Sequence, residues 1–359
     1  MKHYDINKLK STLQLHFEWN LARFKFIGNF ITSLIICSTV NLNKISLWIN
    51  SKAKNESNYR GIQRFFQKFM MNYAEYGKFV ILHLPKKDRF YLVMDRTNWK
   101  FGKIDINILM LGIIHKKMCF PLCWMLLDKK GSSSTSERKE LLSNAIDLLG
   151  KQRIIALLGD REFIGVNWFK FLIDKGIEFH IRLPKQIKIG SVLQENRKPI
   201  THILRYWKEN VKIDYHKKLD ICGFKLYLFG MRSKKDHCII VSSKNNLNSL
   251  EKYQLRWTIE NMFGAFKTRG FNFEDTHMKD LEKIKKLIVL VSIVYVWCVL
   301  IGLWYEETVP IRLMTLGRKR LSTFRYGFNY LTSFIKNVLY KNDCNDLDFN
   351  GVNKILSCT

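Results

Sequence analysis

The chain has 359 residues and carries 60 Lys and Arg against 31 Asp and Glu, which gives a formal net charge of +29. Hydrophobic residues make up 47% of the chain, which excludes disorder throughout, and 5 Pro with 19 Gly exclude a collagen-like or linker-dominated architecture. A chain of this length usually forms two or three domains. The excess of positive charge indicates a polyanionic partner, either nucleic acid or an anionic membrane face, with a basic but otherwise ordinary enzyme as the alternative.

The eight cysteines are scattered along the chain, and only Cys119 and Cys123 lie close together in sequence. No second Cys/His pair follows them at zinc-binding spacing, so we expect reduced cysteines in a reducing compartment. The first ten residues are polar and charged, with no apolar segment typical of a secretion signal behind them. Secretion is therefore not expected.

Residues 1–88 have helical periodicity in three stretches. The third stretch, Tyr59 to Phe79, is rich in Arg and Lys placed between aromatic residues. Three helices with a basic last member suit a small DNA-binding module. A helical cap on the following domain explains the pattern equally well.

From residue 89 to residue 184, apolar β-prone runs alternate with amphipathic helical segments. The expected strands are residues 90–94, 106–114, 119–127, 154–158 and 178–182, and the expected helices are residues 137–149 and 167–175. A polar loop, GSSSTS at residues 131–136, precedes the first of these helices and ends on helix-starting residues. The alternation predicts an α/β core with a mixed sheet.

The next two regions differ in texture. Residues 185–248 contain short alternating runs with polar turns, which predicts an inserted β subdomain, and the chain beyond residue 249 is helical again. Trp207 lies in the β block and either stacks on a nucleic-acid base or packs in the core.

An eighteen-residue uncharged segment, Leu287 to Trp304, is long enough to be considered as a membrane span. Ser292, Tyr295 and Gly302 interrupt it, and the sequence has no second segment of this kind. A buried helix that packs across a sheet would have the same composition, and we favour this interpretation over a membrane anchor.

Three acidic residues stand where they can converge. Asp95 ends one hydrophobic strand and Asp160 ends another, so two carboxylates at one sheet edge can share a hard cation such as Mg²⁺.

The third acid lies on the expected helix from Tyr253 to Lys267. On this helix Tyr253, Arg256, Glu260 and Lys267 fall at i, i+3, i+7 and i+14, which places them on one face. Trp257, Phe263 and Phe266 fall elsewhere and can pack inward. One carboxylate flanked by Arg and Lys suits a metal with phosphates on either side, whereas the alternative is a solvated face with an Arg256–Glu260 ion pair.

At these residues the sequence resembles the IS4 family of bacterial DDE transposases. That family carries a Y-x₂-R-x₃-E-x₆-K signature, which Tyr253, Arg256, Glu260 and Lys267 match at every spacing. Asp95 in DRTNW corresponds to the family's first aspartate and Asp160 in GDREF to its second. The resemblance extends from about Phe90 to Gly327. The N-terminal 88 residues carry less information about the family.

The resemblance implies a ribonuclease-H-like α/β catalytic core with a β-strand insertion between the second Asp and the Glu, flanked by N- and C-terminal helices. The implied regions are residues 1–88 (helical), 89–184 (first part of the core), 185–248 (inserted β subdomain), 249–310 (catalytic and packing helices) and 311–359 (helical C-terminal region).

The resemblance also implies the chemistry. Asp95, Asp160 and Glu260 would hold two Mg²⁺ ions, with Mn²⁺ as a substitute, for in-line phosphoryl transfer. Tyr253, Arg256 and Lys267 would bind DNA phosphates. The partners would be the terminal inverted repeats of an insertion sequence and its target DNA, and no membrane would be bound. The protein would act as a homodimer, in the bacterial cytoplasm at the nucleoid.

Three alternatives remain open at this point. The first is a transposase-derived DNA-binding protein that has lost its chemistry, although all three acids are present. The second is a metal-dependent nuclease that never joins strands. The third is a basic membrane-anchored protein built around residues 287–304.

Overall fold

The computed structural model describes residues 11–101, 104–190, 197–233, 237–245, 248–340 and 348–357. The first ten residues, Cys344 and Cys358 lie outside the described residues, and the six described cysteines carry free thiols. The chain forms two compact units. The sheet unit comprises residues 85–98 and 107–261, and the helical unit comprises residues 1–84, 99–106 and 262–359.

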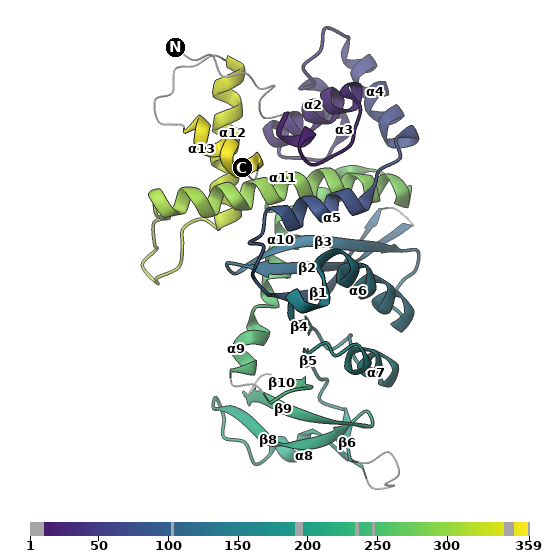
Figure 1. The fold of residues 1–359 in the computed structure, drawn as a ribbon, viewed down its shortest axis with the longest axis vertical. Coiled ribbons are helices and arrows are strands. Elements are labelled where there is room, and N and C mark those ends of the chain that lie inside the picture. Colours follow the sequence, from purple (N-terminus) through teal and green to yellow (C-terminus); the bar gives the residue numbers. More distant parts are fainter. Residues whose placement is uncertain are drawn as a thin grey trace. The chain divides into compact units, whose positions relative to one another are not determined.

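The sheet unit is built on one mixed sheet with strand order β3-β2-β1-β4-β5-β10-β9-β8-β6-β7 (Figure 1). The strands are β1 (Phe90–Phe101), β2 (Ile104–His115), β3 (Met118–Leu127), β4 (Ile154–Gly159), β5 (Phe179–Arg182), β6 (Lys188–Ile189), β7 (Lys198–Pro199), β8 (Lys212–Ile221), β9 (Phe224–Arg232) and β10 (His237–Ser242). β1, β4 and β5 run parallel, whereas β2–β3, β5–β10, β10–β9 and β9–β8 are antiparallel pairs. The central strands are continuous apolar runs, as expected of strands buried on both faces, and Leu92, Val93 and Met94 are fully buried.

The predicted β block at residues 185–248 does form strands, but they extend the same sheet. β10 pairs with β5 through Val241 and Ile181, and β9 and β8 follow outward. The strands of residues 185–248 and the strands next to Asp95 and Asp160 therefore belong to one hydrogen-bonded sheet.

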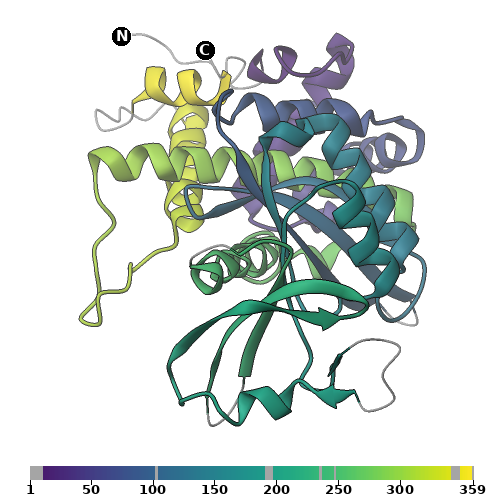
Figure 2. The same ribbon diagram turned by 60° about the horizontal axis from the view of Figure 1, so that its bottom comes forward.

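The helices of the sheet unit are α6 (Thr135–Leu149), the 3₁₀ turn η1 (Lys151–Arg153), α7 (Val166–Asp174), α8 (Thr201–Leu204) and α9 (Ser249–Gln254). The GSSSTS loop starts α6 as predicted, because Ser134 and Glu137 form a capping box. The Ser134 N–H donates to Glu137 Oε2 at 2.6 Å, and Glu137 N–H donates to Ser134 Oγ at 3.3 Å. α6 and α7 lie side by side (Figures 1 and 2).

The helical unit contains α2 (Leu21–Cys37), α3 (Leu42–Leu47), α4 (Asn55–Lys68), α5 (Tyr73–Leu82), the 3₁₀ turn η2 (Phe273–Thr276), α11 (Leu281–Thr308), α12 (Thr323–Tyr340) and α13 (Phe349–Ser357). The expected single helix from Tyr59 to Phe79 was wrong, because it divides into α4 and α5. Phe69 is extended at the end of α4, and the Asn72 side chain accepts the Ala74 N–H to start α5.

The apolar segment forms the core of this unit. α11 is the described helix long and apolar enough to cross a membrane, and 83% of that apolar window is buried. It packs against α2, α4, α5, α12 and α13, and α12 crosses it steeply (Figures 1 and 2). The crossing requires glycine, since a Cβ on Gly302 would overlap the Thr323 carbonyl oxygen and one on Gly327 that of Cys298.

Candidate active site

Two aspartates meet where neighbouring parallel strands stop pairing. The β1–β4 register ends at Met94 and Gly159, so Asp95 and Asp160 are the next residues on each strand. The prediction that Asp95 ends its strand was wrong, because β1 continues to Phe101. Asp160 does follow the last residue of β4. The parallel alignment places both carboxylates at the same edge of the sheet unit.

The predicted single helix from Tyr253 to Lys267 was also wrong. α9 ends at Gln254 and α10 spans Trp257–Phe266, with a turn at Leu255 and Arg256 between them. The backbone N–H groups of Arg256 and Ile259 donate to carbonyls only three residues back, at 2.9 and 3.1 Å, so the chain tightens to 3₁₀ geometry. The tighter turn changes the face that each side chain occupies and directs Arg256 toward the strand acids.

Arg256 connects two of the acids. Its Nη1 donates to Asp95 Oδ2 at 3.0 Å and its Nη2 donates to Glu260 Oε1 at 2.5 Å. The Arg256 side chain is 7% exposed, against 16% for Asp95 and 34% for Glu260, so both ion pairs are largely shielded from water. Tyr253 Oη donates a longer hydrogen bond to Asp160 Oδ1 at 3.5 Å. Asp95, Asp160, Tyr253, Arg256 and Glu260 thus form one connected site within the sheet unit, which we call the acid–arginine site.

The electrostatics of the site follow from burial. The pKa of Asp95 is raised to about 6, and burial of the carboxyl is the largest cause. The Arg96 N–H and the Arg256 guanidinium oppose this rise, and the charges of Asp160 and Glu260 contribute to it. Burial alone would lower the pKa of Arg256, yet its neighbours, Asp95 and Glu260 among them, raise it above the usual value. The Arg256 guanidinium is therefore the counter-ion of two of the three acids, Asp95 and Glu260.

The donor set suits a hard divalent cation, because carboxylate oxygens are the ligands that Mg²⁺ prefers. Within the described ranges, however, no three His, Cys, Asp or Glu side chains lie close enough together to hold one metal ion. The positive charge between Asp95 and Glu260 is that of Arg256. The carboxylates are thus of the kind that binds Mg²⁺, but in this structure the described side chains are not gathered around one point, and the Arg256 guanidinium is the counter-ion of Asp95 and Glu260.

A second polar network supports the Asp95 strand and was missed by the sequence analysis. The Arg96 guanidinium donates to Glu162 at 3.1–3.4 Å and to Asn107 Oδ1 at 3.1 Å. Asn107 in turn donates to the carbonyls of Lys129 and Gly131, both at 3.0 Å. This network ties the turn after β4 and the loop before α6 to the residue next to Asp95. The available signal was Asn107, a polar residue within the otherwise apolar run of residues 106–114.

Two other predicted residues lie differently from expectation. Lys267 follows the last residue of α10 and belongs to the helical unit, where its Nζ lies 3.0 Å from Glu274 Oε1 and 5.7 Å from the Trp99 ring centre. The expectation that Trp257 packs inward was wrong, because its side chain is 59% exposed. Phe263 and Phe266 are buried as expected, and Trp207 packs in the core.

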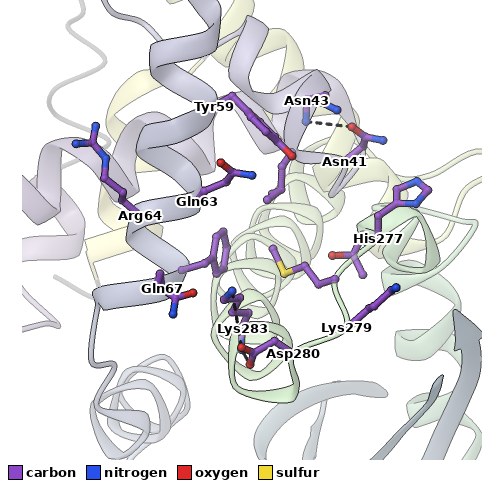
Figure 3. Close-up of a pocket in the computed structure, with 14 residues that line it drawn as sticks. Asn41, Asn43, Tyr59, Gln63, Arg64, Gln67, His277, Lys279, Asp280 and Lys283 are labelled. Atoms are coloured by element: carbon purple, nitrogen blue, oxygen red, sulfur yellow. Dashed lines mark hydrogen bonds and ion pairs between the residues drawn. The ribbon is translucent and has the colours of Figure 1, made fainter. Parts of the chain in front are cut away.

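The helical unit has a polar groove of about 630 Å³ (Figure 3). One wall is α4, which contributes Tyr59, Gln63, Arg64 and Gln67, and the other is the segment from Thr276 to Lys283. Figure 3 shows Lys279 and Lys283 on this second wall, where Lys283 Nζ pairs with Asp280 at 3.7 Å. The groove combines amides, an aromatic ring and cations, which suits an anionic ligand with hydrogen-bonding groups.

A mixed sheet with acids on adjacent parallel strands, joined to a glutamate on the following helix, defines an α/β protein with a carboxylate-rich site. The comparison with protein families identifies it further. The chain belongs to the transposase DDE domain family, whose model matches residues 94–297 and includes Asp95, Asp160 and Glu260. Its general function is therefore DNA transposition.

Comparisons with individual proteins add little to this assignment. No curated protein sequence matches the chain significantly. Among solved structures, a piggyBac transposase synaptic complex with hairpin DNA has 11% identity and a TM-score of 0.42, over 98% of this chain and 82% of that one. The NurA nuclease from Sulfolobus solfataricus has 13% identity and a TM-score of 0.26, over 65% of this chain and 92% of that one. Similarity at these scores carries no argument about this chain.

Proposed function

We propose that this protein is an IS4-family transposase that cleaves the ends of an insertion sequence and joins them to target DNA. The observation that carries the proposal is the connected acid–arginine site, in which Arg256 links Asp95 to Glu260 and Tyr253 contacts Asp160. It lies within the matched transposase domain and contains three of the four signature residues.

In this proposal Asp95, Asp160 and Glu260 hold Mg²⁺, or Mn²⁺ as a substitute. When bound, the metal acidifies water and stabilises charge on the transferring phosphoryl group. Arg256 pairs with Asp95 and Glu260, and its guanidinium could bind a DNA phosphate with two parallel hydrogen bonds if a cation took its place beside these acids. Tyr253 orients the Asp160 carboxylate. Lys267 binds a second phosphate.

The remaining parts of the proposal concern partners and place. We propose a homodimer that pairs the two terminal inverted repeats and acts at the bacterial nucleoid. The groove of Figure 3 supports DNA contact by the N-terminal helices, because Gln63 and Gln67 can hydrogen-bond base edges while Arg64, Lys279 and Lys283 bind phosphates. Replacing Arg64 and Lys279 by alanine is expected to weaken binding to duplex DNA and to lower its salt dependence.

The decisive experiment uses the DNA that borders the gene. Inverted repeats from this DNA, incubated with the full-length protein and Mg²⁺, should be cut at their ends and joined to a target plasmid. Asp95→Asn, Asp160→Asn and Glu260→Gln should each reduce cleavage by at least about a thousandfold, because each removes a proposed metal ligand. Asp174→Asn is the matched control, since this exposed carboxylate lies on α7 and, among the described residues, forms an ion pair with Lys170.

Each alternative has a distinct result. Cleavage without joined products would identify a nuclease. Repeat binding without cleavage would identify an inactive DNA-binding descendant. Full cleavage by Glu260→Gln would exclude the proposed role of the acid–arginine site.

A further inference from the structure

The segment between α11 and α12 forms a projecting hairpin that is separate from the residues of the acid–arginine site. Residues 312–320, which we call the arm, are exposed without interruption, and they lead away from α11 and back to α12 (Figures 1 and 2). Leu313 and Lys319 form an antiparallel bridge. The Gly317 N–H donates to the Met314 carbonyl at 2.8 Å, and Gly317 has a φ of +71°, which favours glycine at this turn.

The base of the arm is fixed to the helices. Ile311 is buried, and the Tyr326 hydroxyl donates to the Val309 carbonyl at 2.9 Å. Lys319 pairs with Glu306 near the end of α11, and Glu306 also accepts from the Thr323 hydroxyl at 3.3 Å. The hairpin is thus held at its root while its tip extends into solvent.

Three of the four cations on the arm, Arg312, Arg318 and Arg320, have no carboxylate partner among the described residues, whereas Lys319 pairs with Glu306. Arg312 and Arg320 face each other in the register of the Leu313–Lys319 bridge, and the Arg320 N–H donates to the Arg312 carbonyl at 2.9 Å. In the described part of the chain, no ion pair links Arg312, Arg318 or Arg320 to a carboxylate, and the sequence has no acid between Glu307 and Asp343. Like charges directly opposite each other destabilise a hairpin, so this arrangement favours an anion bound between them.

The tip is apolar. Leu313, Met314 and Leu316 are 67%, 59% and 86% exposed, and together they form an apolar patch on the arm. Nine residues are few beside the roughly 20–30 residues that each side of a standard protein interface contributes. Leu and Met are, in contrast, side chains that minor-groove proteins insert between base pairs while Arg and Lys hold the flanking phosphates.

We propose that the arm binds double-stranded DNA in the minor groove, with Arg312, Arg318 and Arg320 on the phosphates and Leu316 wedged between two base pairs. This inference rests on the proposed transposase function for its ligand and adds a contact surface outside the acid–arginine site. The wedge would kink the duplex and unstack the bases beside it.

Two measurements on the full-length protein test the proposal. The first is the salt dependence of binding to a fluorescein-labelled 30-base-pair duplex, chosen because non-specific binding to DNA needs only phosphate contacts. Replacing Arg312, Arg318 and Arg320 together by alanine should lower the slope of log K against log salt by about 0.9 per lost contact, or about 2.7 in total. Lys336→Ala, an exposed cation of α12 outside the arm, gives a control slope.

The second measurement is the fluorescence of 2-aminopurine placed in central TA steps, which unstack easily. Wild-type protein should increase it, and Leu316→Ala should abolish the increase while leaving the salt slope unchanged. Leu47→Ala is the matched control, because Leu47 is also largely exposed, at 66%, but lies at the end of α3.

The outcomes separate the two proposals. A wild-type protein that binds no duplex overturns both the arm and the transposase proposal. A triple variant with an unchanged slope overturns the arm proposal alone. If the triple variant binds DNA like wild type but no longer binds phosphatidylserine vesicles, the arm is assigned to a membrane. If it binds DNA like wild type but no longer forms a dimer measured by light scattering, the arm is assigned to a second chain. Either result would overturn the arm proposal.

Discussion

The two units differ in where they place charged side chains. The sheet unit places ionised side chains within its fold, as the Asp95–Arg256–Glu260 chain and the Arg96–Glu162 pair show. The helical unit fills its interior with the apolar side chains of α11 and exposes its cations on the arm and along the groove. Its buried Lys286 is satisfied by a neutral acceptor, the Phe66 carbonyl at 2.8 Å.

The difference separates two tasks that a polyanion-binding enzyme must perform. Buried pairs cost desolvation energy, so they are kept where fixed geometry matters. Exposed cations bind phosphates with little ordering and respond strongly to salt. A site for chemistry and a surface for holding DNA therefore have different physical signatures, and the two sites that we propose for these tasks lie in different units.

The largest expected effect comes from removing the guanidinium of the sheet unit. Arg256→Gln leaves Asp95 and Glu260 without their counter-ion and should lower the free energy of unfolding by about 3–5 kcal/mol. Added Mg²⁺ should restore more of this stability in the variant than it adds to wild type, since the cation then replaces the lost charge. Urea unfolding with and without Mg²⁺ measures both effects.

Equal stabilisation of the two proteins by Mg²⁺ would contradict the idea that Arg256 and a metal compensate the same acids. Arg161→Gln is the control for loss of an arginine charge close to the site, because Arg161 follows Asp160 directly in sequence.

The next effect comes from a titrating group in the helical unit. Burial lowers the pKa of His83 to about 4 from its usual 6.5. Between these values the unfolded chain binds more protons than the folded protein, so the free energy of unfolding falls as the pH drops through this window, by up to about 3 kcal/mol. His83→Gln should flatten this part of the profile. A profile identical to that of wild type would show that His83 does not make the helical unit acid-sensitive.

Much of the sheet unit was predictable because its signals are local. The apolar runs ending at Asp95 and Asp160 gave two strands, and the capping residues gave the start of α6. The turn at Arg256 was not predictable, because one partner that draws the side chain away from the helix face is Asp95, 161 positions earlier in the chain. Periodicity assumes a continuous helix and cannot register such a contact.

The helical unit was harder to predict for a related reason. The apolar composition of α11 is also that of a membrane span, and the preference for a buried helix rested on three interrupting residues, whereas the structure shows the helices that pack around it. The arm carries no regular periodicity, so its exposed Leu and paired Arg residues become informative only when the hairpin is seen.

A smaller effect tests the close packing of the helical unit. Gly327→Ala places a methyl group against the Cys298 carbonyl of α11, so the two helices must separate. We expect a loss of about 1–3 kcal/mol in the free energy of unfolding, measured by urea denaturation. An unchanged midpoint would mean that this helix crossing tolerates more space than the structure indicates.

The smallest effect is its matched counterpart, Gly61→Ala in α4. A Cβ at Gly61 meets no atom within 4 Å, and the residue lies inside a helix. Alanine should therefore stabilise the protein by up to about 1 kcal/mol, through its higher helix propensity and the reduced entropy of the unfolded chain. If the free energy of unfolding rises for Gly61→Ala and falls for Gly327→Ala, glycine is required at the α11–α12 contact but not in α4. The same sign at both positions would remove that distinction, since both changes would then report helix propensity alone.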